Sequence, residues 1–227
     1  MKKYIFLLLL LPVWVSAQNT QIVEATSGKV LSGQVSAQFQ YLLPEFTEGE
    51  VYYKARNGRG MLNYNMLVGE MQFLENNQVM ALTNVKDVLM VNIDNRKFYP
   101  FKNNEFAEEL LSTGKCQLRV KRSGSFSPQS KKSAYGMETS SANITSVTSM
   151  GTYNKQLTVN EKVLINVRNF YYLVGTNGKY HLIKNVQTFT KQFPEHREQI
   201  EEFVIEQKTR YNNEDDLKAL LDYCSKL

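Results

Sequence analysis

Apolar and polar residues alternate in short stretches along the first half of the chain, and each stretch ends at a turn signal. Alternation with a period of two places one set of side chains on each face of a strand. The turn signals are Asn57-Gly58, Asn76-Asn77 and Asp94-Asn95-Arg96, because Asn, Asp and Gly tolerate the positive φ angles of tight hairpins. The pattern predicts three hairpins, which pair residues 51–54 with 61–65, 70–74 with 79–82, and 87–93 with 97–101.

Further extended stretches lie on both sides of these hairpins. Residues 30–43 are β-like and residues 115–122 alternate strictly, while Asn177-Gly178 predicts a fourth hairpin. The strands expected in the last third of the chain cover residues 163–167, 170–174 and 179–184.

One segment breaks this rhythm between the strands. In residues 104–112, four apolar residues lie three or four positions apart, and Gly114 follows as a possible C-cap. The spacing predicts a short helix; these residues are Phe106, Ala107, Leu110 and Leu111.

The end of the chain is expected to be helical. Pro194 suits the first turn of a helix whose apolar stripe is Ile200, Phe203 and Val204. Asn213 is placed to cap a last helix, since three acidic residues follow it at the positive end of the helix dipole. The apolar stripe of that helix is Leu217, Leu220, Leu221 and Cys224.

These elements predict an α+β fold. We expect an antiparallel meander sheet or partly open barrel of short hairpins in a β-rich domain over residues 18–190, with a C-terminal helical hairpin over residues 191–227 packed on it. Residues 123–152 are rich in Ser and Thr and lack clear periodicity, so we expect a long flexible loop there.

The first residues have the composition of a secretory signal peptide. Lys2 and Lys3 precede an apolar run over residues 4–15, and small residues lead to Ala17. Cleavage after residue 17 would give an exported protein, periplasmic or extracellular. The run is shorter than the about 20 residues of a membrane span, so we expect no transmembrane span after cleavage. No cysteine follows the cleavage site, which argues against a lipid anchor.

The net charge of the chain bears on whether it binds nucleic acid. The chain carries 27 basic and 22 acidic residues, a net charge of +5, and loss of Lys2 and Lys3 leaves +3. Proteins that bind nucleic acid usually concentrate much more positive charge on one face. We therefore expect no nucleic-acid partner, and a protein, glycan or lipid partner in the cell envelope.

The two cysteines, Cys116 and Cys224, fall on the apolar sides of a predicted strand and a predicted helix. Free cysteine is among the most buried residue types, so two small buried hydrophobic residues are one interpretation. The other is a single long-range disulfide, which an oxidising compartment permits.

Catalytic signatures are scarce. The chain has only two histidines, and it lacks the spacing of zinc sites, calcium loops and the nucleophile elbow. No pair of carboxylates stands out as the two acids of a glycosidase. We therefore expect no cofactor and no metal, and we favour a non-catalytic role.

Glu70 and the aromatic residues are the remaining candidates for a ligand-binding surface. Glu70 lies in a predicted strand, where a solvated or ion-paired side chain is the simpler interpretation. The chain has 13 tyrosines and 12 phenylalanines, and adjacent aromatic pairs must point to opposite faces of a strand. We therefore consider a ligand surface that includes Glu70, Tyr53 and Tyr64.

Two regions resemble a group of uncharacterised exported proteins of Gram-negative bacteria. They are residues 49–73, with Gly49-Glu-Val-Tyr-Tyr-Lys54 and Gly69-Glu-Met-Gln-Phe73, and the tail from Phe193-Pro-Glu-His196 to Tyr223-Cys224. The resemblance implies export and a β-rich body with a helical C-terminus, and it implies no activity and no site residues.

The resulting hypothesis is an exported periplasmic or envelope protein that acts as a non-catalytic binding or interaction module. A carboxylate-dependent hydrolase of envelope or dietary polymers is the first alternative. A half-barrel that carries a lipid or glycan is the second.

Overall fold

A computed structural model describes residues 20–25, 29, 31–128 and 161–227. The proposed signal peptide and residues 129–152 of the expected loop lie outside the described residues. The described strands form one antiparallel sheet with the order β1-β10-β9-β8-β7-β6-β2-β3-β4-β5, and β11 also pairs with β10. The sheet is not closed into a barrel and carries the C-terminal helices, which confirms the α+β meander. The strands are β1 (Thr20–Ala25), β2 (Thr47–Tyr53), β3 (Asn57–Asn65), β4 (Glu70–Glu75), β5 (Gln78–Ala81), β6 (Val88–Ile93), β7 (Arg96–Pro100), β8 (Phe106–Ser112), β9 (Cys116–Pro128), β10 (Glu161–Gly175) and β11 (Tyr180–Leu182).

Short helices follow β1, β5, β7 and β11, and the two longer helices, α4 and α5, come at the end of the element order. The α-helices are α1 (Ala37–Gln40), α3 (Gln187–Thr190), α4 (Arg197–Glu206) and α5 (Glu214–Lys226), and the 3-10 helices are η1 (Leu31–Gln34), η2 (Val85–Asp87), η3 (Lys102–Asn104) and η4 (Pro194–His196). Among the residues that the structure describes, no helix is long and apolar enough to cross a membrane.

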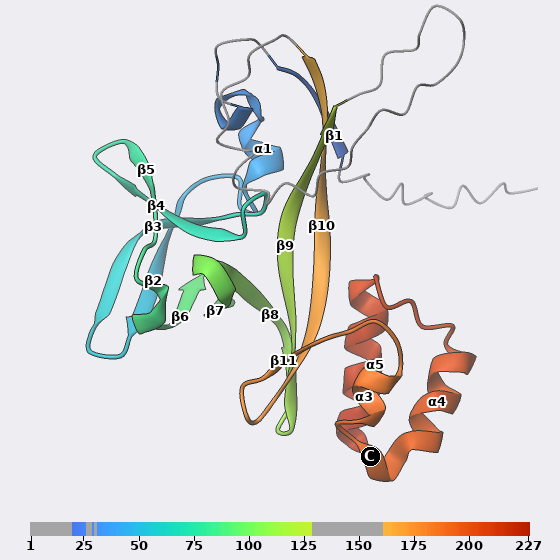
Figure 1. Cartoon of the computed structure of the whole chain (residues 1–227). Helices are drawn as coiled ribbons and strands as arrows, with labels where there is room; N and C mark the ends of the chain where they lie inside the picture. Colours follow the sequence, from blue (N-terminus) through green and yellow to red (C-terminus); the bar gives the residue numbers. More distant parts are fainter. Residues whose placement is uncertain (1–19, 26–28, 30, 129–160) are drawn as a thin grey trace, which may run out of the picture.

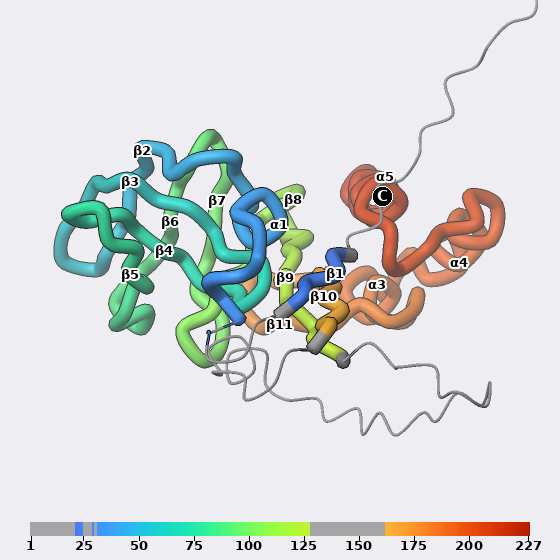
Figure 2. Tube along the Cα trace, turned by 90° about the horizontal axis from the view of Figure 1, so that it is seen from above, coloured from blue at the N-terminus to red at the C-terminus, as the bar shows by residue number. Residues whose placement is uncertain are grey.

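The two longest strands, β9 and β10, form the spine of the molecule (Figure 1). Strands β2 to β8 curl away on one side of this ribbon, and helices α3 to α5 lie on the other side (Figures 1 and 2). The turn between β3 and β4 returns to the spine, where the amide of Gly124 donates to the carbonyl of Leu67 at 2.7 Å. This contact holds the curled half against β9.

The buried apolar residues form separate clusters. One lies between the spine and the helices, one fills the curled half, and one lies under η1 beside β1 and β10. The curled half is filled by large side chains with at most 1% of their surface exposed, among them Tyr64, Phe98 and Phe106.

Most of the predicted turn residues have the backbone conformation that their turns require. Asn76, Asn77, Asp94 and Asn95 all have positive φ angles, between 48° and 62°, which confirms two of the predicted hairpin turns. Gly178 also has a positive φ angle, 71°, in the turn between β10 and β11. The hairpin of β2 and β3 is present as well, but Asn57 and Gly58 belong to β3, and Gly58 pairs with Val51.

The helix predicted over residues 104–112 is wrong, because this segment contains strand β8 between β7 and β9. The register of β8 against β9 shifts between Glu109 and Leu111, so Leu110 is an extra residue in the strand. Leu110 and Leu111 both pack against the helix-side cluster. Phe106 packs in the curled half instead, so the helix-like apolar spacing comes from a strand whose residues serve two different cores.

Two strand boundaries also differ from expectation. The stretch predicted as extended over residues 30–43 contains η1 and α1, and Tyr41 makes an isolated bridge to Asn65. Leu31 and Val35 are buried in the cluster next to β1, so packing determines their conformation. In contrast, β9 continues to Pro128 because Ser123–Pro128 pairs with β10, so the expected loop does not begin at residue 123.

The C-terminal helices agree with the sequence. The side chain of Asn213 accepts a hydrogen bond from the amide of Asp216 at 3.0 Å, which confirms the N-cap of α5. The whole predicted stripe of α5 is buried in the cluster against β9 and β10, with Leu217, Leu220, Leu221 and Cys224 all at 0% exposure.

Candidate functional site

The most concentrated group of polar and aromatic side chains lies on the face of β7 to β11 that points away from α5. Leu118 and Val120 of β9 pack against the helices, so the alternation of the strand turns Arg119 and Lys121 to the opposite face. Tyr172 of β10 pairs with Arg119 and therefore shares that face. We call this group the outer-face cluster; its members are Tyr99, Phe101, Arg119, Lys121, Tyr172 and Tyr180.

Three of the rings contact one another. The ring centroids of Phe101 and Tyr180 lie 5.0 Å apart, and those of Phe101 and Tyr172 lie 5.2 Å apart. Tyr172 and Tyr180 are 5.8 Å apart in an edge-to-face arrangement. These spacings are typical of favourable aromatic pairs. All three residues are half-buried, so part of each remains accessible.

Arg119 joins the rings to the polar part of the cluster. Its guanidinium lies 3.7 Å from the ring centroid of Tyr99 and 5.2 Å from that of Tyr180, within the range of cation–π attraction. The guanidinium also donates to the hydroxyl of Tyr180 and to the side-chain oxygen of Gln117. The hydroxyl of Tyr180 in turn donates to the carbonyl of Pro100 at 3.2 Å. Burial raises the pKa of Tyr180.

Two buried polar atoms at the cluster have no hydrogen-bond partner. They are Nε of Arg119 and Oε2 of Glu109, and these two residues are register partners on β9 and β8. Such atoms are rare in folded proteins, because a buried polar group without a partner costs free energy. Burial, followed by the charge of Glu109 and a hydrogen bond with its carboxylate, raises the pKa of Tyr99, so Glu109 also interacts with a tyrosine of the cluster.

Lys121 connects the cluster to a pair of carboxylates. Its ammonium lies 2.7 Å from Oε1 of Glu105 and 5.7 Å from the ring centroid of Phe101. The backbones of Glu105 and Glu70 form an isolated antiparallel bridge. Glu70 is only 7% exposed, and burial, followed by the charge of Glu105, raises the pKa of its carboxyl. Glu70 is thus a buried strand residue and not a solvated one.

The turn between β3 and β4 brings Glu70 to this place. Gly69 has a φ angle of 74°, and its carbonyl accepts a hydrogen bond from the amide of Phe106 at 2.7 Å. A side chain at residue 69 would be strained at this φ angle, and its Cβ would lie 3.2 Å from the carbonyl oxygen of Arg122. Glycine therefore allows the turn to dock on β8 and β9.

Three openings border the outer-face cluster, and each is lined by one of its members. Tyr180 lines a cavity of about 380 Å³ beside α3, Arg119 lines one of about 270 Å³ at the hairpin tips, and Phe101 lines one of about 450 Å³ beside η3. Basic side chains line all three; they include Lys184, Lys191, Lys115, Lys86 and Lys102.

The structure places the proposed ligand residues in different environments. Glu70 adjoins the outer-face cluster through Glu105 and Lys121. Tyr64 is fully buried, donates to the carbonyl of Phe106 at 3.0 Å, and accepts from the amide of Arg122 at 3.3 Å. It is a core residue with no surface to offer a ligand. Tyr53 packs against the core of the curled half, away from the cluster.

Sequence reasoning did not select the members of the outer-face cluster. The signal was present in Phe98-Tyr99, because two adjacent aromatic residues on a strand cannot both face the core. Phe98 is buried in the curled half and Tyr99 lies on the other face. The pair Tyr171-Tyr172 follows the same rule, since Tyr171 packs beneath the helices.

Within the described ranges, no three His, Cys, Asp or Glu side chains come together to hold a metal ion. Cys116 and Cys224 are both buried free thiols in this structure. Comparisons of the chain with models of protein families, with curated proteins and with solved structures gave no match.

The burial of Glu70 predicts a pH-dependent penalty on folding. A carboxyl whose pKa is higher in the folded state supports folding below its unfolded pKa, near 4.5, and loses that support as the pH rises through its folded pKa. We expect Glu70→Gln to raise the free energy of unfolding at pH 7 and to leave it nearly unchanged at pH 4. Urea unfolding between pH 4 and pH 8 measures this difference.

The matched control for this variant is Glu75→Gln, an exposed glutamate at the other end of β4. It should show the same stability as the wild type across the pH range. A Glu70→Gln variant whose stability followed that of the wild type at every pH would contradict the buried carboxylate.

Proposed function

We propose that this chain is an exported, non-catalytic binding module of the cell envelope, and that its outer-face cluster binds a saccharide. The observation that carries the proposal is the combination of half-buried rings that contact one another with the guanidinium of Arg119, which lies over the rings of Tyr99 and Tyr180. Sugar rings present apolar C–H faces that stack on aromatic rings, and hydroxyl groups that both donate and accept.

The proposed export supports an envelope ligand. Residues 1–17 have the n-region, h-region and small-residue end of a signal peptide. The ligand is placed on the outer face because the interior of the curled half is filled by packed side chains. The basic residues around the three cavities favour a neutral or acidic glycan over a cationic ligand.

Calorimetric titration of the full chain with soluble oligosaccharides tests the proposal. The probes are chitotetraose, cellotetraose, maltoheptaose and oligogalacturonate. We expect one of them to bind, and Phe101→Ala to weaken that binding about tenfold, since the stacking area of one ring is lost. The aromatic fluorescence of the protein provides a second readout.

The matched control is Tyr52→Ala. Tyr52 is a half-buried tyrosine on β2, in the curled half, and its hydroxyl donates to the carboxylate of Glu50 on the same strand. Binding by this variant should equal that of the wild type. Absence of binding to every probe, or an equal loss in both variants, would contradict a saccharide site at the cluster.

A carboxylate-dependent hydrolase remains the second candidate, and the pair of Glu70 and Glu105 is the observation that favours it. A buried carboxyl with a raised pKa suits a general acid, and Glu105, which pairs with Lys121 at 2.7 Å, is the second carboxylate beside it. Incubation of the chain with the same oligosaccharides, followed by chromatography, tests this function. Shorter products made by the wild type and absent with Glu70→Gln would favour the hydrolase over the binding module.

A further inference from the structure

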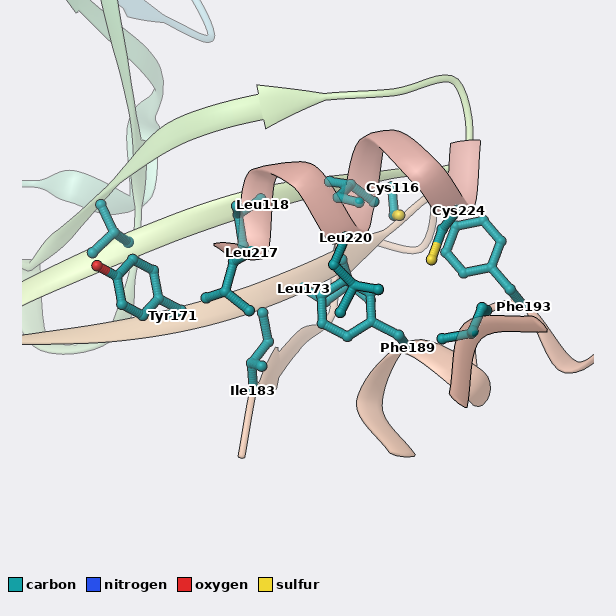
Figure 3. Packing of buried hydrophobic residues seen from close by; sticks show 13 residues of the cluster. Cys116, Leu118, Tyr171, Leu173, Ile183, Phe189, Phe193, Leu217, Leu220 and Cys224 are labelled. Atoms are coloured by element: carbon teal, nitrogen blue, oxygen red, sulfur yellow. The ribbon is translucent and has the colours of Figure 1, made fainter. Parts of the chain in front are cut away.

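Cys116 and Cys224 come from distant parts of the chain and meet in one core. Cys116 is the first residue of β9 and Cys224 lies in the last turn of α5. They are 3% and 0% exposed and belong to the same apolar cluster. Figure 3 shows both sulfur atoms in the space between α5 and the start of β9, near Phe193.

The two thiols differ in how they can be reached. Cys116 lines the cavity of about 270 Å³ at the hairpin tips, together with Lys115 and Thr113. Burial raises its pKa, while the hydroxyl of Thr113 and the charge of Lys115 act in the opposite direction. Burial, followed by the charge of Cys116, raises the pKa of Cys224 to about 12. Cys116 is therefore the thiol that an external reagent meets first.

We propose that Cys116 and Cys224 form an intramolecular disulfide that fastens α5 to β9 when the protein reaches an oxidising compartment. This inference rests on the export that is part of the proposed function. Cys224 lies in α5, which packs on the sheet through its apolar stripe. A covalent link at this point would keep the last helix on the sheet, against which its whole apolar stripe is buried.

The step needs a disulfide donor of the thiol–disulfide oxidoreductase class. The thiolate of Cys116 attacks one sulfur of the donor disulfide and displaces the other sulfur as a thiolate, which gives a mixed disulfide. Cys224 then loses its proton and attacks the sulfur of Cys116, and the donor leaves as its second thiolate. Two protons and two electrons pass from the two cysteines to the donor, which ends as a dithiol.

The experiment expresses the full chain, including residues 1–17, in a bacterial host that exports it. The purified protein is denatured, treated with iodoacetamide with and without prior reduction, and weighed intact. We expect no alkyl group without reductant and two after reduction. Cys116→Ser and Cys224→Ser should each take up one alkyl group under both conditions.

Thermal unfolding of the wild type with and without reductant provides a second readout. A link between residues 116 and 224 closes a long loop in the unfolded chain, so reduction should lower the melting temperature of the wild type by on the order of 10 °C. The Cys116→Ser/Cys224→Ser double variant should melt at the same temperature with and without reductant.

The mass also separates the two proposals, because a mature protein that begins at Gln18 demonstrates export. Exported protein that takes up two alkyl groups without reductant would overturn the disulfide and leave the proposed function intact. If residues 1–17 are retained, the export premise fails. The folded chain is then treated with oxidised glutathione, and failure to form the bond there would also overturn the inference.

Discussion

Replacing Glu108 with leucine is expected to lower the free energy of unfolding by about 3–5 kcal/mol, the cost of breaking a buried ion pair from one side. The carboxylate of Glu108 is 4% exposed and bonds Nη1 of Arg122 at 2.5 Å and Nη1 of Arg96 at 2.7 Å. The side chain of Arg122 is 9% exposed, so Glu108→Leu leaves its charge in the core without this partner. Urea unfolding followed by circular dichroism measures the loss.

Two further variants show whether the cost arises from the pair. Glu201→Leu removes an exposed ion pair with Arg197 on α4, and should change the stability by no more than about 0.5 kcal/mol. Glu108→Leu/Arg122→Met removes both buried charges and should recover most of the stability lost in the single variant. Equal losses of stability in Glu108→Leu and Glu201→Leu would mean that the buried ion pair contributes no more to the free energy of unfolding than the exposed one.

Replacing Leu220 with alanine is expected to cost about 2–5 kcal/mol, because it leaves a cavity between α5 and the sheet. Leu220 has no exposed surface and belongs to the cluster that contains Leu173 of β10 and Phe189 of α3 (Figure 3). Hydrogen exchange should show increased opening of α5 beyond the global loss, since this helix is held by its apolar stripe.

Ile205→Ala on α4 is the control, because Ile205 is 76% exposed. Its effect should stay within about 0.5 kcal/mol. If Leu220→Ala had an equally small effect, α5 would not be a stabilising part of the fold.

In the outer-face cluster, the face that each side chain takes follows from the sequence, whereas its neighbours on that face do not. The alternation of β9 determines that Arg119 lies opposite Leu118, and the aromatic pairs determine that one ring of each points away from the core. Neither pattern says that Tyr180 bonds Arg119, which is 61 residues away in the sequence. That contact depends on the pairing of β10 with both β9 and β11.

Glu70 is an acidic residue in a strand, for which the sequence favours a solvated or ion-paired side chain, but the structure buries it and leaves it 7% exposed. The turn that ends at Gly69 folds back on β8 and β9, and this long-range contact buries Glu70 beside Glu105. Tyr64, on the neighbouring strand β3, is predicted to belong to the ligand surface, yet it is enclosed by the curled half. In both cases the environment comes from segments distant in the sequence.

Several local features of this protein follow from its amino-acid sequence alone: the turns at Asn76-Asn77 and Asp94-Asn95, the cap at Asn213, and the buried stripe of α5. Each of these depends on the backbone preferences or periodicity of neighbouring residues. Three other features required the folded chain: the bulged strand over residues 106–112, the side chains that surround Arg119, and the meeting of Cys116 with Cys224. These features depend on the order of strands in the sheet, because periodicity assigns a side chain to a face and does not identify its neighbours there.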